Sequence, residues 1–234
     1  MNRPSQIRAV IFDMDGVLTD SEPLINAAAV AMFKEQGLVV QPADFLPFVG
    51  AGEDRYIGGV AEEYGFSLDL PSAKRRTYEI YLGLVPTSLH AFPGAQDFVR
   101  RCREAGLLVA VASSADAIKI AANLRQIGLP GDFWDGVVTG EEVYHKKPAP
   151  DIFLAAAQKL AVTPAECVVV EDAVNGVQAA KAAGMRCIAV AQTFPAGQLR
   201  AADVVRENIV QVRLSDVDPS VELDQASLTP MAFS

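Results

Sequence analysis

Short apolar runs of strand length recur along the chain, separated by amphipathic segments of helix length. The runs that predict buried strands are 7–12, 107–112, 137–138, 167–170 and 186–191. The segments that predict helices after the second run are 117–127, 150–160 and 174–183. Alternation of continuous apolar strands with helices is typical of a parallel sheet covered on both faces. The pattern therefore predicts an α/β fold built on a doubly wound parallel sheet.

A long segment between the first two predicted strands has a different pattern. Helical spacing of apolar residues covers 22–36, 54–64 and 72–82, with glycine and proline turn signals between the three segments. We therefore expect a helical domain inserted between the first and second strands of the sheet.

These patterns divide the chain into three parts. Residues 1–20 and 91–215 are expected to form a Rossmann-like core, and residues 21–90 an inserted helical cap. The polar segment 216–234 contains two prolines and is expected to form a flexible tail.

Composition and charge narrow the classes of function. Of the 234 residues, 50% are hydrophobic and 21% charged, which supplies material for a buried core and excludes a disordered chain. The formal net charge of −9 argues against partners such as nucleic acids and anionic membrane surfaces. No apolar run approaches the roughly 20 residues that span a bilayer.

The cysteines and the first residues bear on the compartment. Cys102, Cys167 and Cys187 form no close pair in sequence, so we expect reduced thiols in a reducing compartment. The first predicted strand begins too early for a signal or transit peptide to precede it. We therefore expect a cytoplasmic location.

Two acids directly follow the first predicted strand. Asp13 and Asp15 stand two residues apart, so in an extended chain both side chains project beyond the carboxyl end of the strand. Open α/β sheets bind ligands at that end. Two carboxylates this close repel, and either a proton or a nearby cation must offset their charge. The alternative is an ordinary acidic turn that ends at Gly16.

Three further motifs follow later strands. Ser113 and Ser114 end the second strand, where hydroxyls and free amides suit a phosphate oxygen, although such serines often only cap a helix. Lys147 lies on a loop stiffened by prolines, and its alternative is a solvated basic loop. Glu171 and Asp172 end the fourth strand, and the alternative for Asp172 is a helix cap.

The four motifs together point to one site. Parallel strands bring their carboxyl ends to one edge of a sheet, so we expect the acids, a hydroxyl and Lys147 to meet there. Clustered carboxylates need a hard cation with oxygen ligands, and Mg²⁺ fits that need. A phosphate group could approach such a cluster only if Mg²⁺ and Lys147 offset the repulsion.

The motifs in this order resemble the haloacid dehalogenase superfamily, in its β-phosphoglucomutase-like branch with a helical cap after the first motif. The resemblance covers about residues 7–205 and rests on Asp-x-Asp-Gly-Val at 13–17, Lys-Pro-x-Pro-Asp at 147–151 and Glu-Asp at 171–172. A further set of segments is similar to the phosphatase-like domain of plant suppressor-of-quenching proteins: 45–50, 57–61 and 151–157.

The resemblance implies catalytic roles. Asp13 would be the nucleophile that forms an aspartyl-phosphate, and Asp15 would protonate the leaving alkoxide and then activate water. Ser113, Ser114 and Lys147 would hold the transferred phosphoryl group. Dehalogenases proper lack the second aspartate, so cleavage of a carbon–halogen bond is not expected.

The same resemblance implies a Mg²⁺ cofactor. The Asp13 carboxylate, the Asp15 carbonyl and Asp172 would hold the ion, with Glu171 in support through water. The cap would close over a small substrate and exclude water. Its loop, with Gly50, Gly52 and Glu53, should face that substrate.

The chain departs from the sugar-mutase pattern in the cap. Ile25 stands where mutases carry histidine, Glu53 where they carry arginine, and Asp116 where they carry lysine. A mutase must hold a second phosphate, which calls for cations in the cap. This loop is acidic, and we expect Arg55 to be its nearest positive charge.

We therefore expect Mg²⁺-dependent hydrolysis of a small phosphomonoester, such as a sugar or organic phosphate, by a monomeric phosphatase. One alternative is phosphoryl transfer of the β-phosphoglucomutase type. Another is an interaction or regulatory domain of the superfamily with little turnover. If the chain is a domain of a plant-type protein, the chloroplast stroma is the alternative compartment.

Overall fold

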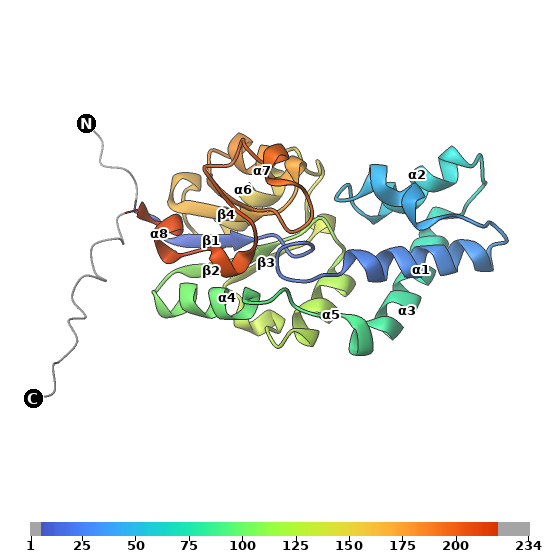
Figure 1. Ribbon diagram of the computed structural model, residues 1–234, viewed down its shortest axis with the longest axis horizontal. Coiled ribbons are helices and arrows are strands. Elements are labelled where there is room, and N and C mark those ends of the chain that lie inside the picture. Colours follow the sequence, from blue (N-terminus) through green and yellow to red (C-terminus); the bar gives the residue numbers. More distant parts are fainter. Residues whose placement is uncertain (1–5, 220–234) are drawn as a thin grey trace, which may run out of the picture.

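The computed structural model describes residues 6–219 (Figure 1). A six-stranded sheet forms the centre of one domain, with strand order β3-β2-β1-β4-β5-β6 and every neighbouring pair parallel. The strands are β1 Ala9–Phe12, β2 Leu108–Ala112, β3 Gly136–Val138, β4 Cys167–Glu171, β5 Arg186–Val190 and β6 Val204–Arg206. The predicted α/β fold with a Rossmann-like parallel sheet is confirmed.

Helices cover both faces of this sheet, as its apolar strands require. On one face pack α4 (Ala95–Glu104) and α5 (Ala117–Gln126), and on the other α6 (Asp151–Lys159) and α7 (Val174–Ala182). The four residues of β1, at the middle of the sheet, have no solvent exposure. Burial on both sides explains why this strand is continuously apolar and holds its last residue firmly in place.

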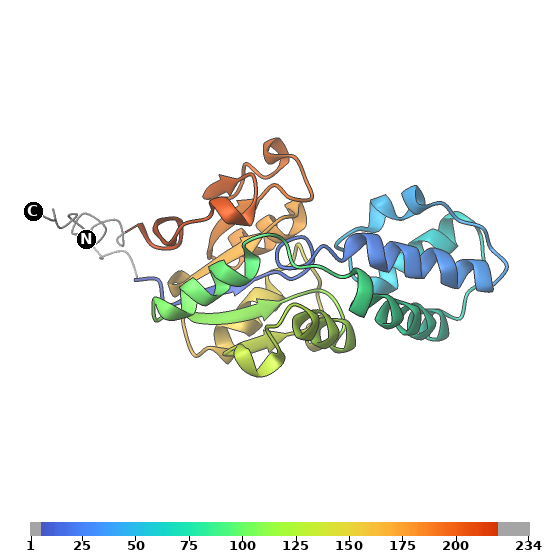
Figure 2. The ribbon, with the colours of Figure 1, turned by 60° about the horizontal axis from the view of Figure 1, so that its bottom comes forward.

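All of the regular secondary structure in the inserted segment is helical. It contains α1 (Glu22–Glu35), the 3₁₀ helix η1 (Pro42–Phe48), α2 (Glu53–Glu63) and α3 (Leu70–Ser88). These helices share an apolar core of their own, which includes Phe33, Phe45 and Tyr81. Figure 2 shows them as a second unit beyond the carboxyl end of the sheet, so the cap faces the edge where the motifs end.

Two connecting segments join the cap to the core, and they are hydrogen-bonded to each other. The amide of Asp20 donates to the carbonyl of His90 at 3.1 Å, and the amide of Phe92 donates to that of Leu18 at 3.0 Å. Thr19 and Ala91 form an antiparallel bridge between the two connections. The cap therefore leaves and rejoins the core at one point.

The structure contains elements that the apolar pattern did not single out. Helix α4 buries Ala95, Phe98, Val99 and Cys102, a spacing that its four arginine and glutamate residues obscured. Strand β6 is short and only partly buried, so it lacks an apolar run. The remaining short 3₁₀ helices are Gly131–Phe133, Gly140–Glu142, Pro164–Glu166, Ala196–Gln198 and Ile209–Gln211.

The flexible tail was expected from residue 216, but the first residues of that segment are ordered against the core. Helix α8 spans Leu214–Val217, and within it Asp216 and Val217 are buried. Asp216 is paired with the guanidinium of Arg206, which explains why a polar segment is held against the core here. Residues 220–234 lie outside the described part of the chain. Within that part, no helix combines the length and the apolarity that a membrane span requires.

Candidate active site

Three of the four motifs stand at the end of a strand, at the edge of the sheet that faces the cap. Asp13 follows β1, Ser113 follows β2, and Glu171 and Asp172 lie at the end of β4. Strands β1 and β4 are neighbours at the point where the strand order reverses, which is where open parallel sheets bind ligands. Lys147 reaches the same edge from the loop between β3 and α6.

Lys147 joins the first and last motifs. Its Nζ lies 2.5 Å from Oδ1 of Asp13 and 2.5 Å from Oε1 of Glu171, and the lysine side chain is only 5% exposed. Burial disfavours the charged lysine, but the two carboxylates outweigh it and raise the pKa of Lys147. The ammonium therefore stays charged at the centre of the site.

The carboxylate of Glu171 is fixed by the start of α7. Its Oε2 accepts from the backbone amides of Asp172 and Ala173, both at 2.8 Å. Gly176 makes room for it, because a Cβ there would stand 1.7 Å from Oε1. With both oxygens engaged, Glu171 acts as a fixed counter-charge to Lys147, not as an open ligand.

The charge state of Asp13 is less firmly fixed than that of Lys147. Burial, together with the charges of Glu171 and Asp15, raises the pKa of Asp13 to about 7 although the Lys147 ammonium opposes this rise. Only 7% of Asp13 is exposed. One ammonium does not offset the several acids around it.

Asp172 increases that excess of negative charge. Asp172 is buried, and its pKa is raised well above the ordinary value, first by desolvation and then by the charges of Glu171 and Asp13. Its carboxylate lies against Gly16, where a Cβ would stand 2.0 Å from Oδ2. The side chain of Thr193 also contacts the Asp172 carboxylate.

Asp15 turns toward the cap. Its Oδ1 accepts from the hydroxyl of Ser21, the residue before α1, and its Oδ2 lies 2.9 Å from Nζ of Lys119 on α5. The same ammonium lies 3.3 Å from Oε1 of Glu53, the first residue of α2. Asp15 is therefore held by one donor from each side.

The two predicted serines differ in environment. Ser113 is buried, and its Oγ accepts from the amide of Ala115 at 3.2 Å, which leaves the hydroxyl proton available as a donor. The Oγ of Ser114 is buried without a hydrogen-bond partner among the described residues. Both line the cavity described next.

A cavity of about 1310 Å³ separates these residues from the cap. Gly50, Gly52 and Glu53 line it, so the predicted cap loop does face the site. Gly52 lies close to the core, since a Cβ there would be 3.7 Å from the Ser114 carbonyl oxygen. Arg55 does not supply positive charge to this loop, because it pairs with Glu62 at 2.6 Å on the exposed side of α2.

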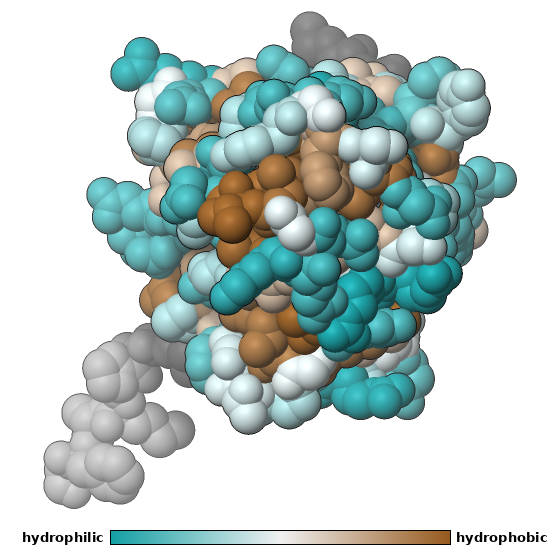
Figure 3. Space-filling model, turned by 90° about the vertical axis from the view of Figure 1, so that its right-hand side faces the viewer, coloured by the Kyte–Doolittle hydropathy of each residue, from teal (hydrophilic) through white to brown (hydrophobic). Residues whose placement is uncertain are grey.

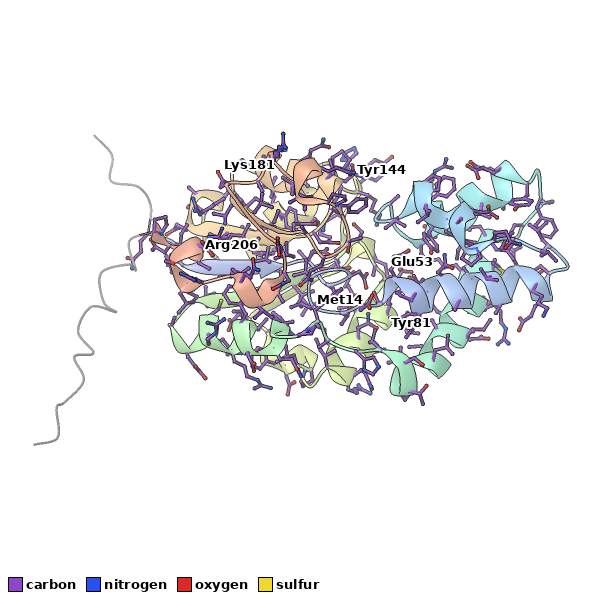
Figure 4. All side chains as sticks on the ribbon, in the orientation of Figure 1. Met14, Glu53, Tyr81, Tyr144, Lys181 and Arg206 are labelled. Carbon is purple, nitrogen blue, oxygen red and sulfur yellow. The ribbon has the colours of Figure 1, made fainter. Side chains whose placement is uncertain are left out.

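The cap end of the molecule carries a mixed surface. Val39 and Leu46 expose 73% and 70% of their area, and Figure 3 shows apolar patches among polar side chains on this face. The polar groups that can act on a phosphate ester lie instead at the junction between cap and core. In Figure 4, Met14, Glu53 and Tyr81 mark that junction.

Sequence reasoning missed the cation beside Asp15. Lys119 lies within α5 among Ile120, Asn123 and Leu124, all buried. Thus a charged residue falls on the apolar face of an amphipathic helix, and that position was the available signal. The expectation that Arg55 is the nearest positive charge to the loop is wrong, because the Lys119 ammonium reaches Glu53 from α5 at 3.3 Å.

The donor set fits Mg²⁺. Among residues 6–219, no three acidic, histidine or cysteine side chains converge as a ready-made metal cage. Mg²⁺ in proteins keeps several waters and uses one or two carboxylates, which is what Asp13 and Asp172 offer. The crowding of Asp172 against Gly16 and the excess of buried negative charge both agree with a cation at this point.

Comparison with known proteins decides the family. The family described as haloacid dehalogenase-like hydrolase matches residues 7–184. The chain belongs to the haloacid dehalogenase-like hydrolases. The predicted family is thereby confirmed.

Relatives of this hydrolase include plant and bacterial proteins. SUPPRESSOR OF QUENCHING 1, a chloroplastic protein of Arabidopsis thaliana, is 49% identical over 219 residues, which are 91% of this chain and 21% of the plant protein. The chain thus spans about a fifth of that relative. Hexitol phosphatase B of Escherichia coli K12 is 34% identical over 93% of this chain and 99% of its own.

A solved structure agrees with this hydrolase in fold. The crystal structure of CbbY from Rhodobacter sphaeroides in complex with phosphate superposes with a TM-score of 0.81 and 28% identity. It covers 91% of this chain and 100% of its own. Core and cap are therefore arranged as in that phosphate-bound CbbY structure.

Proposed function

We propose that this hydrolase cleaves a small phosphomonoester, with Mg²⁺ as cofactor, through a phosphoryl group carried on Asp13. The observation that carries the proposal is the Asp13–Lys147 contact of 2.5 Å at the end of β1, with Asp15 facing the same cavity. The shared cavity supports the assignment of Asp13 as nucleophile, Lys147 as the cation for the phosphoryl group and Asp15 as the acid–base group. The phosphatase names of its bacterial relatives support this reaction.

In the first step Asp13 attacks phosphorus. Lys147 holds Oδ1, so Oδ2 forms the new bond as the bond between phosphorus and the ester oxygen breaks. Negative charge gathers on the phosphoryl oxygens, where Lys147 and the Ser113 hydroxyl stabilise it. Before this step the Asp15 carboxylate takes up a proton from solvent, and Asp15 then gives that proton to the departing alkoxide.

In the second step water releases the phosphate. Asp15, now a carboxylate, takes a proton from the water that attacks phosphorus, and the bond to Asp13 breaks. Asp13 and inorganic phosphate are regenerated together. The same two aspartates thus serve both half-reactions in opposite proton states.

Asp13, Asp172 and the Asp15 carbonyl would hold Mg²⁺, with Glu171 in support through water. The bound ion would supply positive charge against which a phosphate dianion can approach the buried acids. The cap encloses the reaction and limits access of bulk water.

The substrate class follows from the charge of the cap side. Glu53 and Glu22 line the cavity there, and Lys119, the ammonium beside Glu53, is already paired. Lys34 also lines the cavity, but it lies at the opposite end of α1 from Glu22. A leaving group with a second phosphate would meet net negative charge, so a neutral hydroxylated leaving group is favoured over a bisphosphate. This argues for hydrolysis over transfer of the β-phosphoglucomutase type.

The test is release of inorganic phosphate from hexitol, hexose and glycerol phosphates and from 4-nitrophenyl phosphate, with Mg²⁺ and after chelation. Asp13→Asn is the control. Release that survives both chelation and Asp13→Asn would contradict the assignment. Interconversion of glucose phosphates without net release would favour the mutase, and a folded protein inactive on every ester would favour an interaction domain.

Partners and location extend the proposal. We infer that a small phosphorylated metabolite is the partner and that the chain acts as a monomer without nucleic acid or membrane, which the net charge of −9 supports. Size-exclusion chromatography with light scattering tests the monomer. The chloroplastic relative supports the stroma over the cytoplasm, and imaging of the tagged full-length protein tests it.

A further inference from the structure

Lys119 connects the acid–base residue of the core to the cap. Its Nζ lies 2.9 Å from Oδ2 of Asp15 and 3.3 Å from Oε1 of Glu53. These two carboxylates belong to different domains, and Lys119 itself is on the core helix α5. One buried ammonium therefore spans the junction between core and cap.

The position of Lys119 is set by its surroundings. Its side chain is 4% exposed, and its Nζ lies 5.7 Å from the centre of the Tyr81 ring on cap helix α3. The hydroxyl of Tyr81 donates to Oδ1 of Asn123 at 2.7 Å, one turn after Lys119 on α5. A cation over an aromatic ring in a buried setting is stabilised as a charge. The ammonium cannot turn to solvent without leaving these contacts.

Charge makes this lysine indispensable to the local arrangement. Three acids face it, Asp15, Glu22 and Glu53, and the charge of Lys119 opposes the effect of burial on the pKa of Glu22 and Glu53. Without the ammonium, the Asp15 carboxylate would lose one of its two donors and meet two other acids at close range.

We propose that Lys119 is a positioning residue for Asp15, and that its bond to Glu53 makes the working orientation of Asp15 depend on cap closure. The inference rests on the proposed function, because it assigns Asp15 the proton transfers of that reaction. When the cap opens, Glu53 moves away with α2 and one of the two carboxylates that fix Lys119 is lost. Lys119 keeps its own proton throughout; the proton that reaches the alkoxide is that of Asp15.

The nature of the leaving group separates this role from a structural one. An alkoxide needs a proton from Asp15 to depart, whereas 4-nitrophenolate leaves without one. The value of kcat/KM reports the steps up to that departure. A fault in the orientation of Asp15 therefore lowers kcat/KM for an alkyl phosphate but spares 4-nitrophenyl phosphate, whereas a general loss of folding or cap docking lowers both.

The first experiment compares Lys119→Met with the wild type on both esters. We expect kcat/KM to fall by about 10- to 100-fold for glycerol phosphate or a hexitol phosphate and by less than about threefold for 4-nitrophenyl phosphate. Lys119→Arg keeps the charge and should recover part of the loss. Equal losses on both esters, or faster turnover of the alkyl ester by Lys119→Met, would overturn the proposal.

The chain offers a matched control in Lys74. This lysine of cap helix α3 also pairs across the junction, with Asp116 of the core at 2.7 Å and Asp54 of the cap at 2.9 Å, but it does not contact Asp15. Lys74→Met removes a bridge of the same kind and should change both kcat/KM values by one common factor. A preference for the nitrophenyl ester in Lys74→Met would mean that any loosened cap produces the effect.

Glu53→Gln tests the part played by the cap. If Glu53 acts through Lys119, the double variant should lose no more activity on the alkyl ester than Lys119→Met alone. Fully additive losses would contradict the coupling. The thermal unfolding midpoints of all four proteins provide a second cycle, which must also be non-additive.

These outcomes are distinct from failure of the proposed function. An inactive wild type, or activity that survives Asp13→Asn, would refute the phosphoryl mechanism itself. In that case additive unfolding midpoints would refute the Lys119–Glu53 coupling separately.

Discussion

Gly16 lies directly against the carboxylate of Asp172. A Cβ on Gly16 would stand 2.0 Å from Oδ2 of Asp172 and 2.7 Å from Oγ1 of Thr193, and the backbone there has φ +83°. The turn after β1 therefore needs a residue without a side chain for two reasons, the left-handed backbone and the approach of an acid from β4.

Gly16→Ala should abolish most activity, because the new methyl group displaces Asp172. Displacement by about 1 Å at a reacting centre can cost about 100-fold in rate, and we expect at least that loss in phosphate release. Gly37→Ala is the control: Gly37 has φ +85° but no atom within 4 Å of its Cβ position. It should cost about 1 kcal/mol of stability and leave activity intact. Similar activities for the two variants would refute the role of the close contact.

Asp172→Asn should weaken the response to Mg²⁺. The substitution removes a charged oxygen ligand from the proposed site while keeping the size of the side chain. We expect the Mg²⁺ concentration for half-maximal activity to rise by at least about tenfold, measured by titration after chelation. Asp203→Asn changes an acid that directly precedes β6 and does not line the cavity, and it should leave this concentration unchanged. An unaltered Mg²⁺ requirement in Asp172→Asn would exclude Asp172 as a ligand.

Ser113 and Ser114 should differ in their effect on catalysis. The Ser113 oxygen already accepts from the Ala115 amide, so its hydroxyl proton is free for a phosphoryl oxygen. Ser113→Ala should lower kcat/KM by about tenfold, the value of about one hydrogen bond to a charged group. Ser114→Ala removes a buried hydroxyl without a partner among residues 6–219 and should change kcat/KM by less than about threefold. The reverse order would move the phosphate contact to Ser114.

Asp203 should stabilise the core in a pH-dependent way. Burial raises its pKa, but hydrogen bonds from Lys181 at 2.7 Å and the Cys187 amide at 2.8 Å outweigh it and leave the pKa below its ordinary value. A lowered folded-state pKa gives stability that is present above the unfolded-state pKa and lost as the pH falls through the folded-state value. Asp203→Asn should therefore cost roughly 1 kcal/mol near pH 7, since the ion pair is partly solvated, and progressively less in acid.

Denaturant unfolding of Asp203→Asn and wild type between neutral and acid pH measures this effect. Glu207→Gln, a change at an exposed acid nearby, serves as the comparison and should shift stability little. A stability difference for Asp203→Asn that persists unchanged into acid would show that the carboxylate charge is not involved.

Much of the fold was predictable because its signals are local. The strand that precedes Asp13 is apolar throughout, since helices cover both faces of the sheet. Gly16 and Pro148 mark two turns in the sequence. The side chains next to these turns point in directions that strand geometry predicts. Helix α4 has a local apolar spacing that its charged residues obscure, and strand β6 is too short and too little buried to produce an apolar run.

The strand ends and the cap loop that line the site were predictable, but the contact between cap and core was not. Asp13, Lys147 and Asp172 meet because parallel strands bring their ends together, and that rule needs no side-chain geometry. The partner of Glu53 could not be found in the same way. Lys119 is 66 residues away along the chain and reaches Glu53 only because the cap folds back over α5. Contacts between domains depend on docking, which residue spacing does not reveal.

The connections between the domains have a wider consequence. Because the amide of Asp20 and the carbonyl of His90 are 3.1 Å apart, the whole cap begins and ends at one spot on the surface of the sheet domain. An insert with adjoining ends can be exchanged for another without rerouting β1 or α4. Selection of the ester could then change in evolution by replacement of a single module, while the aspartates that transfer the phosphoryl group stay in place.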